Sequence, residues 1–491
     1  MFRRFVVLVA CAIPALADAV EPSDLCTGNP CIITARTVVT GSLDFGPTTD
    51  VRLAPGALLQ IGLPSDDFAE ISLRAGSVVL EAGSRIHART RVTDQMDPWR
   101  VVAIEAASGS IVVERGARVD LRGGAQSELD LSAGGDVVLA GTIDLRTKAA
   151  FAAFLDVTAG GDVTFATTLL GSARGEGSLG SSIYVQAQGG IRIEGRIDST
   201  GHEGGELSFT SESGSVEIDG KVDVSGFRLN GGGGGEVGAG IGGTITIDAP
   251  AGDIHVRKEI LGRGASAFQD YGVGAEVSMT AGGSVFVDGP IRLEGGPNGE
   301  SGSLDVRAGG DFRQSSSGPI LTVGTFSGPD SFAGDVDIDA GGTAVLSRID
   351  LSATSGTGFL EVEAADIEVV GPINSDAMGS FGFAGGSIEL EASEQIWVAG
   401  RIEARGRARD TTGGDIRLRA AEIEIEGEGR IDTRSDRSFS FFASVIALRA
   451  TGPILIAGNV FSNDVNRIEY GTVPPVITGR VEPEPEITQI P

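Results

Sequence analysis

The stretch Gly414–Arg434, "GDIRLRAAEIEIEGEGRIDTR", contains the pattern that decides the fold. Apolar and polar residues alternate through "DIRLRA" and again through "EIEI", and a third short apolar step follows at "RID". Alternation with a period of two places successive side chains on opposite faces of a β-strand. The stretch therefore predicts three short strands in one unit, followed by a loop.

The same unit recurs along most of the chain. Runs such as "GGDVVLAGTIDLR", "GGIRIEGRIDSTG" and "GGSVFVDGPIRLEGG" repeat the second and third steps, and shorter runs such as "GSLDVRAGG" precede them as the first. Aligned on the first apolar residue, the units follow one another at intervals of 24 to 38 residues. The aligned residues are Ile71, Ile104, Leu129, Leu155, Ile183, Leu207, Ile245, Val277, Leu304, Val336, Leu360, Ile388, Ile416 and Ile446.

Each unit has few large side chains, so it can bury its apolar face only by stacking on its neighbours. We therefore predict an all-β fold, a single three-sided parallel β-helix (β-solenoid) of about 14 coils. Parallel crossover connections are almost always right-handed, which predicts a right-handed coil. A β-propeller is the main structural alternative, but its blades need about 40 residues, more than the shortest units offer. With strands ~4.8 Å apart, the predicted rod is roughly 65 Å long.

Residues 1–19 have the features of a signal peptide: Arg3 and Arg4, then an apolar run, then small-residue cleavage sites. A rival interpretation makes Cys11 the lipidated N-terminus of a lipoprotein, but it leaves an apolar core shorter than the usual minimum of about 7 residues. We expect an exported chain that is secreted or associated with the outer membrane or cell surface, with the periplasm as a further location.

Two cysteines lie close together in "LCTGNPCIIT", residues 25–34. Oxidised pairs persist outside the cytoplasm, so we predict a disulfide between Cys26 and Cys31. A redox-active pair is the alternative, but its usual spacing is C-x-x-C. Because the open end of a solenoid needs a cap, we assign residues 20–50 to an N-terminal cap with this disulfide.

The parallel β-helix is assigned to residues 51–470, and residues 471–491 form a Pro-rich acidic tail. Proline cannot donate a hydrogen bond to a β-ladder, so we expect stacking to stop near Tyr470.

The chain has 38 basic and 67 acidic residues and a formal charge of −29. This balance argues against nucleic acid as a partner, since phosphate binding relies on clustered positive charge. Beyond the signal peptide no apolar stretch approaches the ~20 residues needed to span a bilayer. We therefore expect no transmembrane segment in the mature chain.

Stacking in the aligned register predicts an acidic stripe on the outward side of the first strands. Like charges directly opposite one another destabilise a sheet. Two interpretations remain open: a solvated acidic face relieved by salt and by Arg417 and Arg419, or a face on which calcium bridges adjacent carboxylates. The candidate metal-binding residues are Asp337, Asp339, Glu361, Glu363, Glu389 and Glu391.

Aspartate also recurs directly after the third apolar step. Carboxylate pairs can act as general acid and base in glycoside hydrolysis. Recurrence as part of the repeat indicates instead a shared structural role at the strand end, so we assign no catalytic residue. The recurring residues are Asp120, Asp144, Asp198, Asp223, Asp350 and Asp432.

The phrases "AGGDVVLAG", "TAGGDVTF" and "TAGGSVFVDG" resemble the repeats of secreted parallel β-helix proteins of bacteria. The resemblance is greatest to filamentous-haemagglutinin-like adhesins and two-partner-secretion exoproteins, and it covers Val51–Asn463. The Asn-Pro-Asn motifs typical of that family's secretion domain are missing, which puts its export route in doubt for this chain. The resemblance implies a surface or secreted rod involved in adhesion or envelope structure. We expect a non-enzymatic role, with polysaccharide, envelope or host-surface components as partners. The alternative function is a polysaccharide-acting β-helix hydrolase or lyase.

Overall fold

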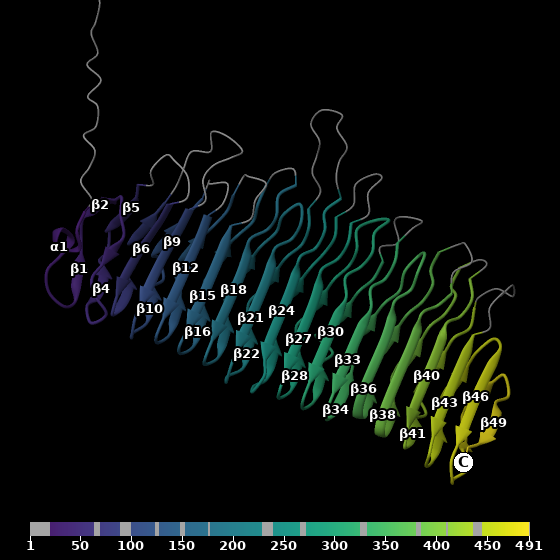
Figure 1. Ribbon diagram of the computed structural model, residues 1–491. Helices are drawn as coiled ribbons and strands as arrows, with labels where there is room; N and C mark the ends of the chain where they lie inside the picture. Colours follow the sequence, from purple (N-terminus) through teal and green to yellow (C-terminus); the bar gives the residue numbers. More distant parts are fainter. Residues whose placement is uncertain are drawn as a thin grey trace, which may run out of the picture.

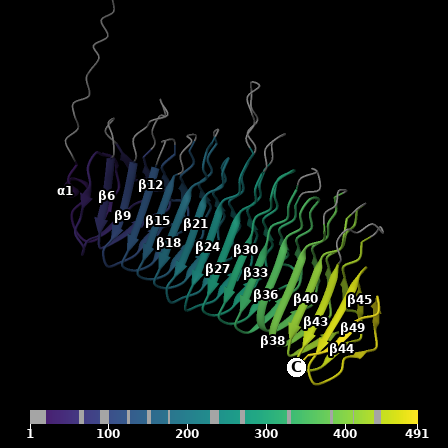
Figure 2. The same ribbon diagram turned by 45° about the vertical axis from the view of Figure 1, so that its right-hand side comes forward.

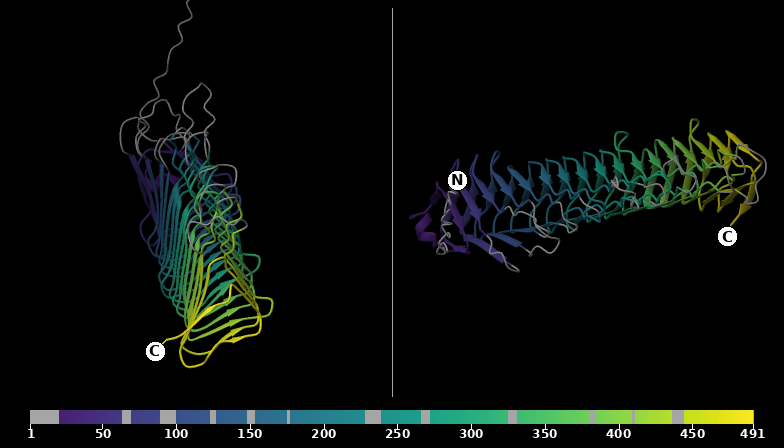
Figure 3. Two further views of the ribbon diagram at one scale, coloured as in Figure 1. Left: turned by 90° about the vertical axis from the view of Figure 1, so that its right-hand side faces the viewer. Right: turned by 90° about the horizontal axis from the view of Figure 1, so that it is seen from above.

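The structure, a computed structural model, is a stack of parallel β-strands in which each turn of the chain lies beside the previous one (Figure 1). It describes residues 20–62, 69–88, 100–122, 127–147, 153–174, 177–227, 239–265, 272–324, 331–379, 384–408, 411–435 and 444–490. Figure 2 and Figure 3 show from further directions that the coils follow one axis. The predicted all-β parallel solenoid is therefore confirmed. The predicted signal peptide, residues 1–19, lies outside the described residues.

Equivalent strands of successive coils pair in parallel and form three ladders, whose outward surfaces are called the first, second and third faces. The first ladder consists of β3 (Leu43–Asp44), β6 (Ala69–Ala75), β9 (Arg100–Ala106), β12 (Ser127–Ala133), β15 (Phe154–Ala159), β18 (Ser182–Ala187), β21 (Glu206–Ser211), β24 (Thr244–Ala249), β27 (Glu276–Ala281), β30 (Leu304–Ala308), β33 (Val336–Ala340), β40 (Asp415–Ala420), β43 (Val445–Ala450), β46 (Val465–Tyr470) and β49 (Glu486–Gln489). The second consists of β1 (Cys31–Ile33), β4 (Asp50–Leu53), β7 (Ser77–Leu80), β10 (Ile111–Val113), β13 (Val137–Leu139), β16 (Val163–Phe165), β19 (Ile191–Ile193), β22 (Val216–Ile218), β25 (Ile254–Val256), β28 (Val285–Val287), β31 (Phe312–Gln314), β34 (Thr343–Leu346), β41 (Glu422–Ile425), β44 (Ile454–Ile456) and β47 (Val476–Ile477). Two longer strands, β36 (Phe359–Val369) and β38 (Ser387–Val398), run through both ladders.

The third ladder is made of the short third strands. It consists of β2 (Arg36–Val39), β5 (Leu58–Ile61), β8 (Arg85–His87), β11 (Arg118–Asp120), β14 (Thr142–Asp144), β17 (Leu169–Leu170), β20 (Ile197–Asp198), β23 (Val222–Asp223), β26 (Ile260–Leu261), β29 (Ile291–Arg292), β32 (Ile320–Leu321), β35 (Ile349–Asp350), β37 (Pro372–Asn374), β39 (Arg401–Glu403), β42 (Arg430–Asp432), β45 (Asn459–Phe461) and β48 (Arg480–Glu482). Within the described chain the only helix is α1 (Pro22–Leu25), and no helix there has the length and apolar character needed to cross a membrane.

The inward side chains form one continuous apolar core along the rod. All of the aligned residues from Ile71 to Ile446 are buried. One alignment is wrong: Leu129 pairs with Val102, and Ile104 pairs with Leu131. A shift of two residues keeps the same side chains inward, so alternation alone cannot detect it.

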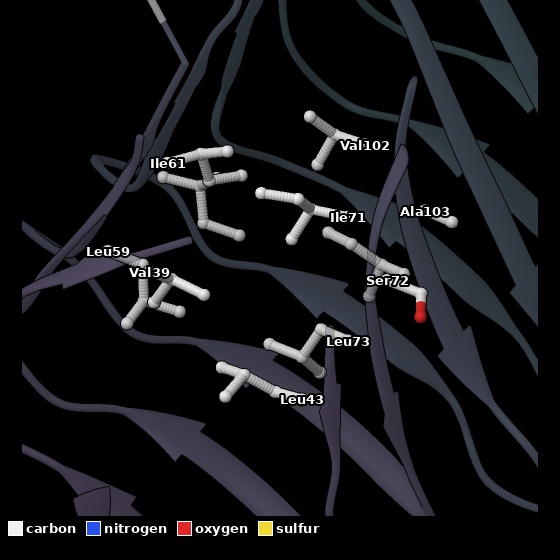
Figure 4. Close-up of a pocket in the computed structure, with 11 residues that line it drawn as sticks. Val39, Leu43, Leu59, Ile61, Ile71, Ser72, Leu73, Val102 and Ala103 are labelled. Carbon is white, nitrogen blue, oxygen red and sulfur yellow. The ribbon is translucent and has the colours of Figure 1, made fainter. Parts of the chain in front are cut away.

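A small defect interrupts the packing of the core. An apolar void of about 20 Å³ lies near the N-terminal end, between residues of the first and third ladders such as Leu73 and Leu59 (Figure 4). A void with aliphatic walls offers water no polar partners. It is therefore a small packing defect and has no features of a ligand site.

The Gly-Gly-Asp phrases form the turn between the first and second ladders. The backbone N–H of Asp162 donates to Oδ1 of Asp136 at 2.9 Å, and the N–H of Gly190 donates to Oδ1 of Asp162 at 2.7 Å. Equivalent bonds lead from Ser284 to Asp253, from Asp311 to Ser284 and from Thr343 to Asp311. Each of these side chains thus holds the next coil, which explains the repeat structurally.

Glycine is required where the next coil crosses such an aspartate. A Cβ atom on Gly161 would lie 2.1 Å from Oδ1 of Asp136, and one on Gly342 would lie 2.2 Å from Oδ1 of Asp311. No real Cβ atom approaches an oxygen so closely. The second glycine of the phrase therefore makes room for the carboxylate of the preceding coil.

At the N-terminal end the predicted cysteine pair is confirmed. Cys26 and Cys31 form a disulfide with a Cα–Cα distance of 5.4 Å, within the normal range for such a bond. Cys31 begins β1 and pairs with Val51, while Leu25 and Cys26 pack against the core. The bridge thus ties the helical turn α1 to the first strand of the second ladder.

The expectation that stacking stops near Tyr470 is wrong. Strands β47, β48 and β49 pair with β44, β45 and β46 and add strands to all three ladders. The prolines of this segment fall between these strands, where no ladder hydrogen bond is required of them. Proline content alone was therefore an unreliable guide to the end of the stack.

Candidate functional site

The first face carries the predicted acidic stripe. Asp337 pairs with Glu361, and Glu361 pairs with Glu389. The second set, Asp339, Glu363 and Glu391, is paired in the same manner two residues further along the strands. The six carboxylates thus lie on adjacent strands in the register that the sequence predicted.

Like charges shift the titration of two of these groups. Burial, followed by the charge of Asp305, raises the pKa of Asp337 above its usual range. Burial, followed by the charges of Asp337 and Glu363, raises the pKa of Glu361. Because neighbouring negative charges disfavour ionisation, this surface gains stability from any counter-charge.

Arginines supply that counter-charge at one end of the stripe. Arg419 Nη1 lies 3.0 Å from Glu391 Oε2, and Arg417 Nη1 lies 3.8 Å from Glu389 Oε2. The predicted ion pairs between these residues are therefore present. No group of three His, Cys, Asp or Glu side chains in the described ranges is arranged to hold a metal ion. Calcium bridging of the stripe stays a prediction.

A second acidic cluster on the first face was missed. Asp130 and Asp156 pair directly in the ladder, and Glu128 lies two residues before Asp130. Burial, then the charges of Glu128 and Asp156, raise the pKa of Asp130 to about 7. Reading the outward column of the first strands from Leu129 and Leu155 would have found this cluster.

On the third face, the six recurring aspartates have the structural role that their recurrence indicated. In each, a side-chain oxygen accepts a hydrogen bond from the residue two positions later. The donors are the backbone N–H groups of Arg122, Arg146, Ser225, Ser352 and Arg434 and the hydroxyl of Thr200. These bonds fix the chain as it leaves the third strand.

Arginines cover the most deeply buried of these carboxylates. Arg146 donates to both oxygens of Asp144 at 2.9 and 2.8 Å. Arg434 donates to both oxygens of Asp432 at 3.0 and 2.8 Å. The two aspartate side chains are 0% exposed, whereas the arginines are 40% and 39% exposed. An arginine two residues after the aspartate was visible in "TIDLR" and "RIDTR" but was not interpreted.

Pairing with arginine opposes the effect of burial on the pKa of these carboxylates. Burial alone raises the pKa of Asp432, but hydrogen bonds from Arg434 and Arg430 outweigh it and hold the pKa below the usual range. Burial likewise raises the pKa of Asp120, but the hydrogen bonds and charge of Arg122, together with the charge of Arg118, outweigh it and lower the pKa. Carboxylates that remain ionised at neutral pH are unsuited to act as general acids.

The three histidines lie in different coils of the stack. His87 Nδ1 lies 3.7 Å from Asp120 Oδ2 on the third face. On the second face His255 stacks on Phe286 with ring centroids 4.5 Å apart. His202 lies after the third strand of another coil. The histidines therefore share no site.

The acidic column of the third face is interrupted in the middle of the rod. Asp223 pairs with Leu261, and the next positions are Arg292 and Leu321 before Asp350 restores the pattern. A cleft of about 740 Å³ opens here. Its lining includes Arg263, Glu294, Pro297, Leu321, Val323, Arg348 and Asp350. The sequence shows that the aspartate is missing from these coils, but it does not show that a cleft forms there.

Polar groups line two sides of the cleft, with apolar side chains between them. Arg263 Nε lies 2.5 Å from Glu294 Oε2 on one side, and Arg292 Nη1 lies 3.5 Å from Glu294 Oε1. On the other side Asp350 Oδ1 accepts the N–H of Ser352 at 3.1 Å. The volume is within the range of small-molecule sites.

Comparison with known proteins adds no assignment: no protein-family model, no curated protein and no solved structure matches the chain.

Proposed function

We propose that this chain is an exported, non-enzymatic β-solenoid that acts as an adhesive or structural rod at the cell surface or outside the cell. The observation that carries the proposal is the single continuous core, which extends through all three ladders. Such a core supplies a rigid, elongated scaffold whose outward residues are free to vary from coil to coil. The resemblance of the repeats to bacterial adhesins supports the same role.

The charged groups of the third face support this proposal too. Asp144 and Asp432, the best buried carboxylates, are each held by arginines and by a turn of the chain. Groups fixed in this way stabilise the coil, and the lowered pKa of Asp432 keeps that carboxylate ionised, as a structural ion pair requires. The proposed partners are polysaccharide, envelope or host-surface components, and export through the N-terminal signal belongs to the proposal.

Location is the first test. Cells expressing the full chain are fractionated, and the protein is followed by antibody in the medium, the outer membrane, the periplasm and the cytoplasm. The proposal expects the protein in the medium or at the surface, with residues 1–19 removed from its N-terminus. Recovery of the full-length chain from the cytoplasm alone would contradict it.

A polysaccharide-acting hydrolase or lyase is the second candidate, and the cleft is the observation that favours it. Glu294 and Asp350 are carboxylates on opposite sides of that cleft. Purified protein is incubated with acidic and neutral polysaccharides, and product length is measured. Chain cleavage that is lost in Glu294→Gln or Asp350→Asn, and kept in Asp415→Asn on the first face, would establish the enzyme and overturn the non-enzymatic proposal.

A further inference from the structure

The cleft of the third face differs in kind from the other charged surfaces of the rod. In other coils, the column of the third ladder that contains Asp223 holds acidic residues paired with arginine: Asp120, Asp144, Asp198, Asp223, Glu403 and Asp432. At the cleft, Leu261 and Leu321 occupy that column and are almost completely buried, at 8% and 9% exposure. Between Asp120 and Glu482 the other interruptions of this column, at Leu170, Asn374 and Phe461, each affect one coil. At the cleft three consecutive coils lack the carboxylate, and a long departure from a structural pattern marks a candidate functional site.

Among the described residues, one cation of the cleft forms no ion pair. The guanidinium of Arg263 is paired with Glu294, but that of Arg348 makes no ion pair with any residue of the described chain. Arg348 precedes Ile349 on the third ladder, and its side chain is exposed. An unpaired guanidinium at the edge of a cleft is ready to receive a carboxylate through two parallel hydrogen bonds.

A groove on the second face provides a contrast. It has a volume of about 350 Å³ and is lined by residues that include Thr164, Arg192 and Glu217. Its cation is already engaged, since Arg192 lies 3.0 Å from Asp219 and 3.2 Å from Glu194. A ligand there would have to displace existing ion pairs. The cleft of the third face requires no such exchange at Arg348.

The ligand that suits the cleft is a polar molecule with one anionic group. Pro297 and Val323 give it a small apolar contact area, and Glu294 and Asp350 offer acceptors for hydroxyl groups. A peptide is less suitable because the strands beneath the cleft are already paired on both sides, which leaves no free edge for strand addition.

We propose that the cleft lined by Arg263, Glu294, Leu321, Val323, Arg348 and Asp350 binds a saccharide that carries a carboxylate, with Arg348 as its anion-binding residue. The inference rests on the proposed adhesive function and assigns one contact site to it. The carboxylate lies against Arg348, the hydroxyl groups donate to Glu294 and Asp350, and the ring packs over Val323 and Pro297.

The test is calorimetric titration of the full-length mature protein with trigalacturonate, with uncharged maltotriose as the reference saccharide. Saturable binding of trigalacturonate is expected. Arg348→Gln weakens it by about tenfold, the usual effect of removing a charge-assisted hydrogen bond. Arg52→Gln is the matched control, since Arg52 is an exposed arginine of β4 on the second face, and it leaves the affinity unchanged. Circular dichroism confirms that both variants are folded.

The proposal would be overturned by no saturable heat with trigalacturonate, by equal weakening in both variants, or by equal affinity for triglutamate, which would indicate a peptide site. Binding of maltotriose as tight as that of trigalacturonate would remove the anionic group from the assignment and also contradict it. None of these results affects the fractionation experiment, so loss of the cleft assignment and loss of the surface-rod function are distinguishable.

Discussion

The first and third faces of the rod solve the same electrostatic problem in different ways. On the first face Asp337 and Glu361 lie beside one another at the surface, and their pKa values are raised. On the third face Asp432 is fully buried, yet its pKa is lowered because arginines cover it. Exposure makes a row of like charges tolerable, whereas burial requires a partner for each charge.

The comparison teaches where stability depends on charge. The third-face carboxylates are part of the folded coil, so loss of a partner leaves a charge in a poorly solvated place. The first-face carboxylates are outside the packing, so their substitution changes repulsion more than packing. Substitution of an acidic residue or its partner can therefore affect the stability of the fold very differently on the two faces of the rod.

The largest expected effect is on the third face. Arg434→Met removes the arginine that donates to both oxygens of Asp432, and we expect a loss of about 3 kcal/mol in the free energy of unfolding. Urea denaturation measures it. The matched variant is Arg419→Met on the first face, whose pair with Glu391 is exposed, and it should cost less than about 1 kcal/mol. Equal losses in the two variants would remove the distinction between the faces.

The next effect concerns the turn that sets the register of the coils. Gly342→Ala places a Cβ atom against the carboxylate of Asp311, and we expect a loss of about 1–3 kcal/mol, the usual cost of an overpacked site. Gly427→Ala is the control, because no atom lies within 4 Å of the added Cβ. The urea midpoints of the two variants measure this loss. A Gly342→Ala protein as stable as Gly427→Ala would argue against the tight turn.

The next prediction tests whether calcium stabilises the acidic stripe of the first face. If calcium bridges the stripe, adding it to chelator-treated protein raises the melting temperature more than magnesium does, because flexible all-oxygen sites favour calcium. The double substitution Glu361→Gln and Glu363→Gln should abolish the difference between the two ions. Asp288→Asn, outside the stripe, should preserve it. Identical melting curves with and without calcium would contradict calcium bridging and leave salt, together with Arg417 and Arg419, to relieve the repulsion on this face.

The smallest effect is a pH dependence of stability at Asp130. The folded state raises its pKa to about 7, so the protonated form is favoured and this contribution is complete below the unfolded pKa of about 4. It is lost as pH rises through about 7. Asp130→Asn should therefore melt about 1–2 °C higher than the unsubstituted protein at pH 8, with a smaller difference at pH 4. A lower melting temperature of Asp130→Asn at pH 8 would contradict the prediction that ionised Asp130 destabilises the folded protein.

The alternating pattern predicted most of this fold for a physical reason. Burial of one side chain in two is recorded in the sequence wherever a strand covers a core, so Leu360, Ile388 and Ile416 could be aligned without coordinates. The two-residue shift at Ile104 could not be recognised, because it preserves the alternation of apolar and polar residues. The extra strands after Tyr470 were not recognised either, because they lie outside the repeating unit used for the alignment. The acidic stripe followed from the same alignment.

The arginine cover and the cleft depend on information of another kind. Arg434 and Asp432 are two residues apart, but their double hydrogen bond depends on the turn that brings the guanidinium back over the strand. The cleft lies where Leu321 occupies the position that Asp350 holds in the next coil, and its lining combines residues of several coils. A repeat describes what successive coils share, whereas a binding site depends on where one coil departs from its neighbours.

The side-chain ladder between the first and second strands has a consequence for how such a rod can change in length. Asp136 holds the coil of Asp162, and Asp162 holds the coil after it. Junctions of this type join a side-chain oxygen of aspartate or serine to a backbone N–H of the next coil. Excision of the segment between two equivalent aspartates would leave an acceptor facing a suitable donor. The rod can thus be shortened or extended in increments of one coil, about 4.8 Å each, while its cross-section stays constant.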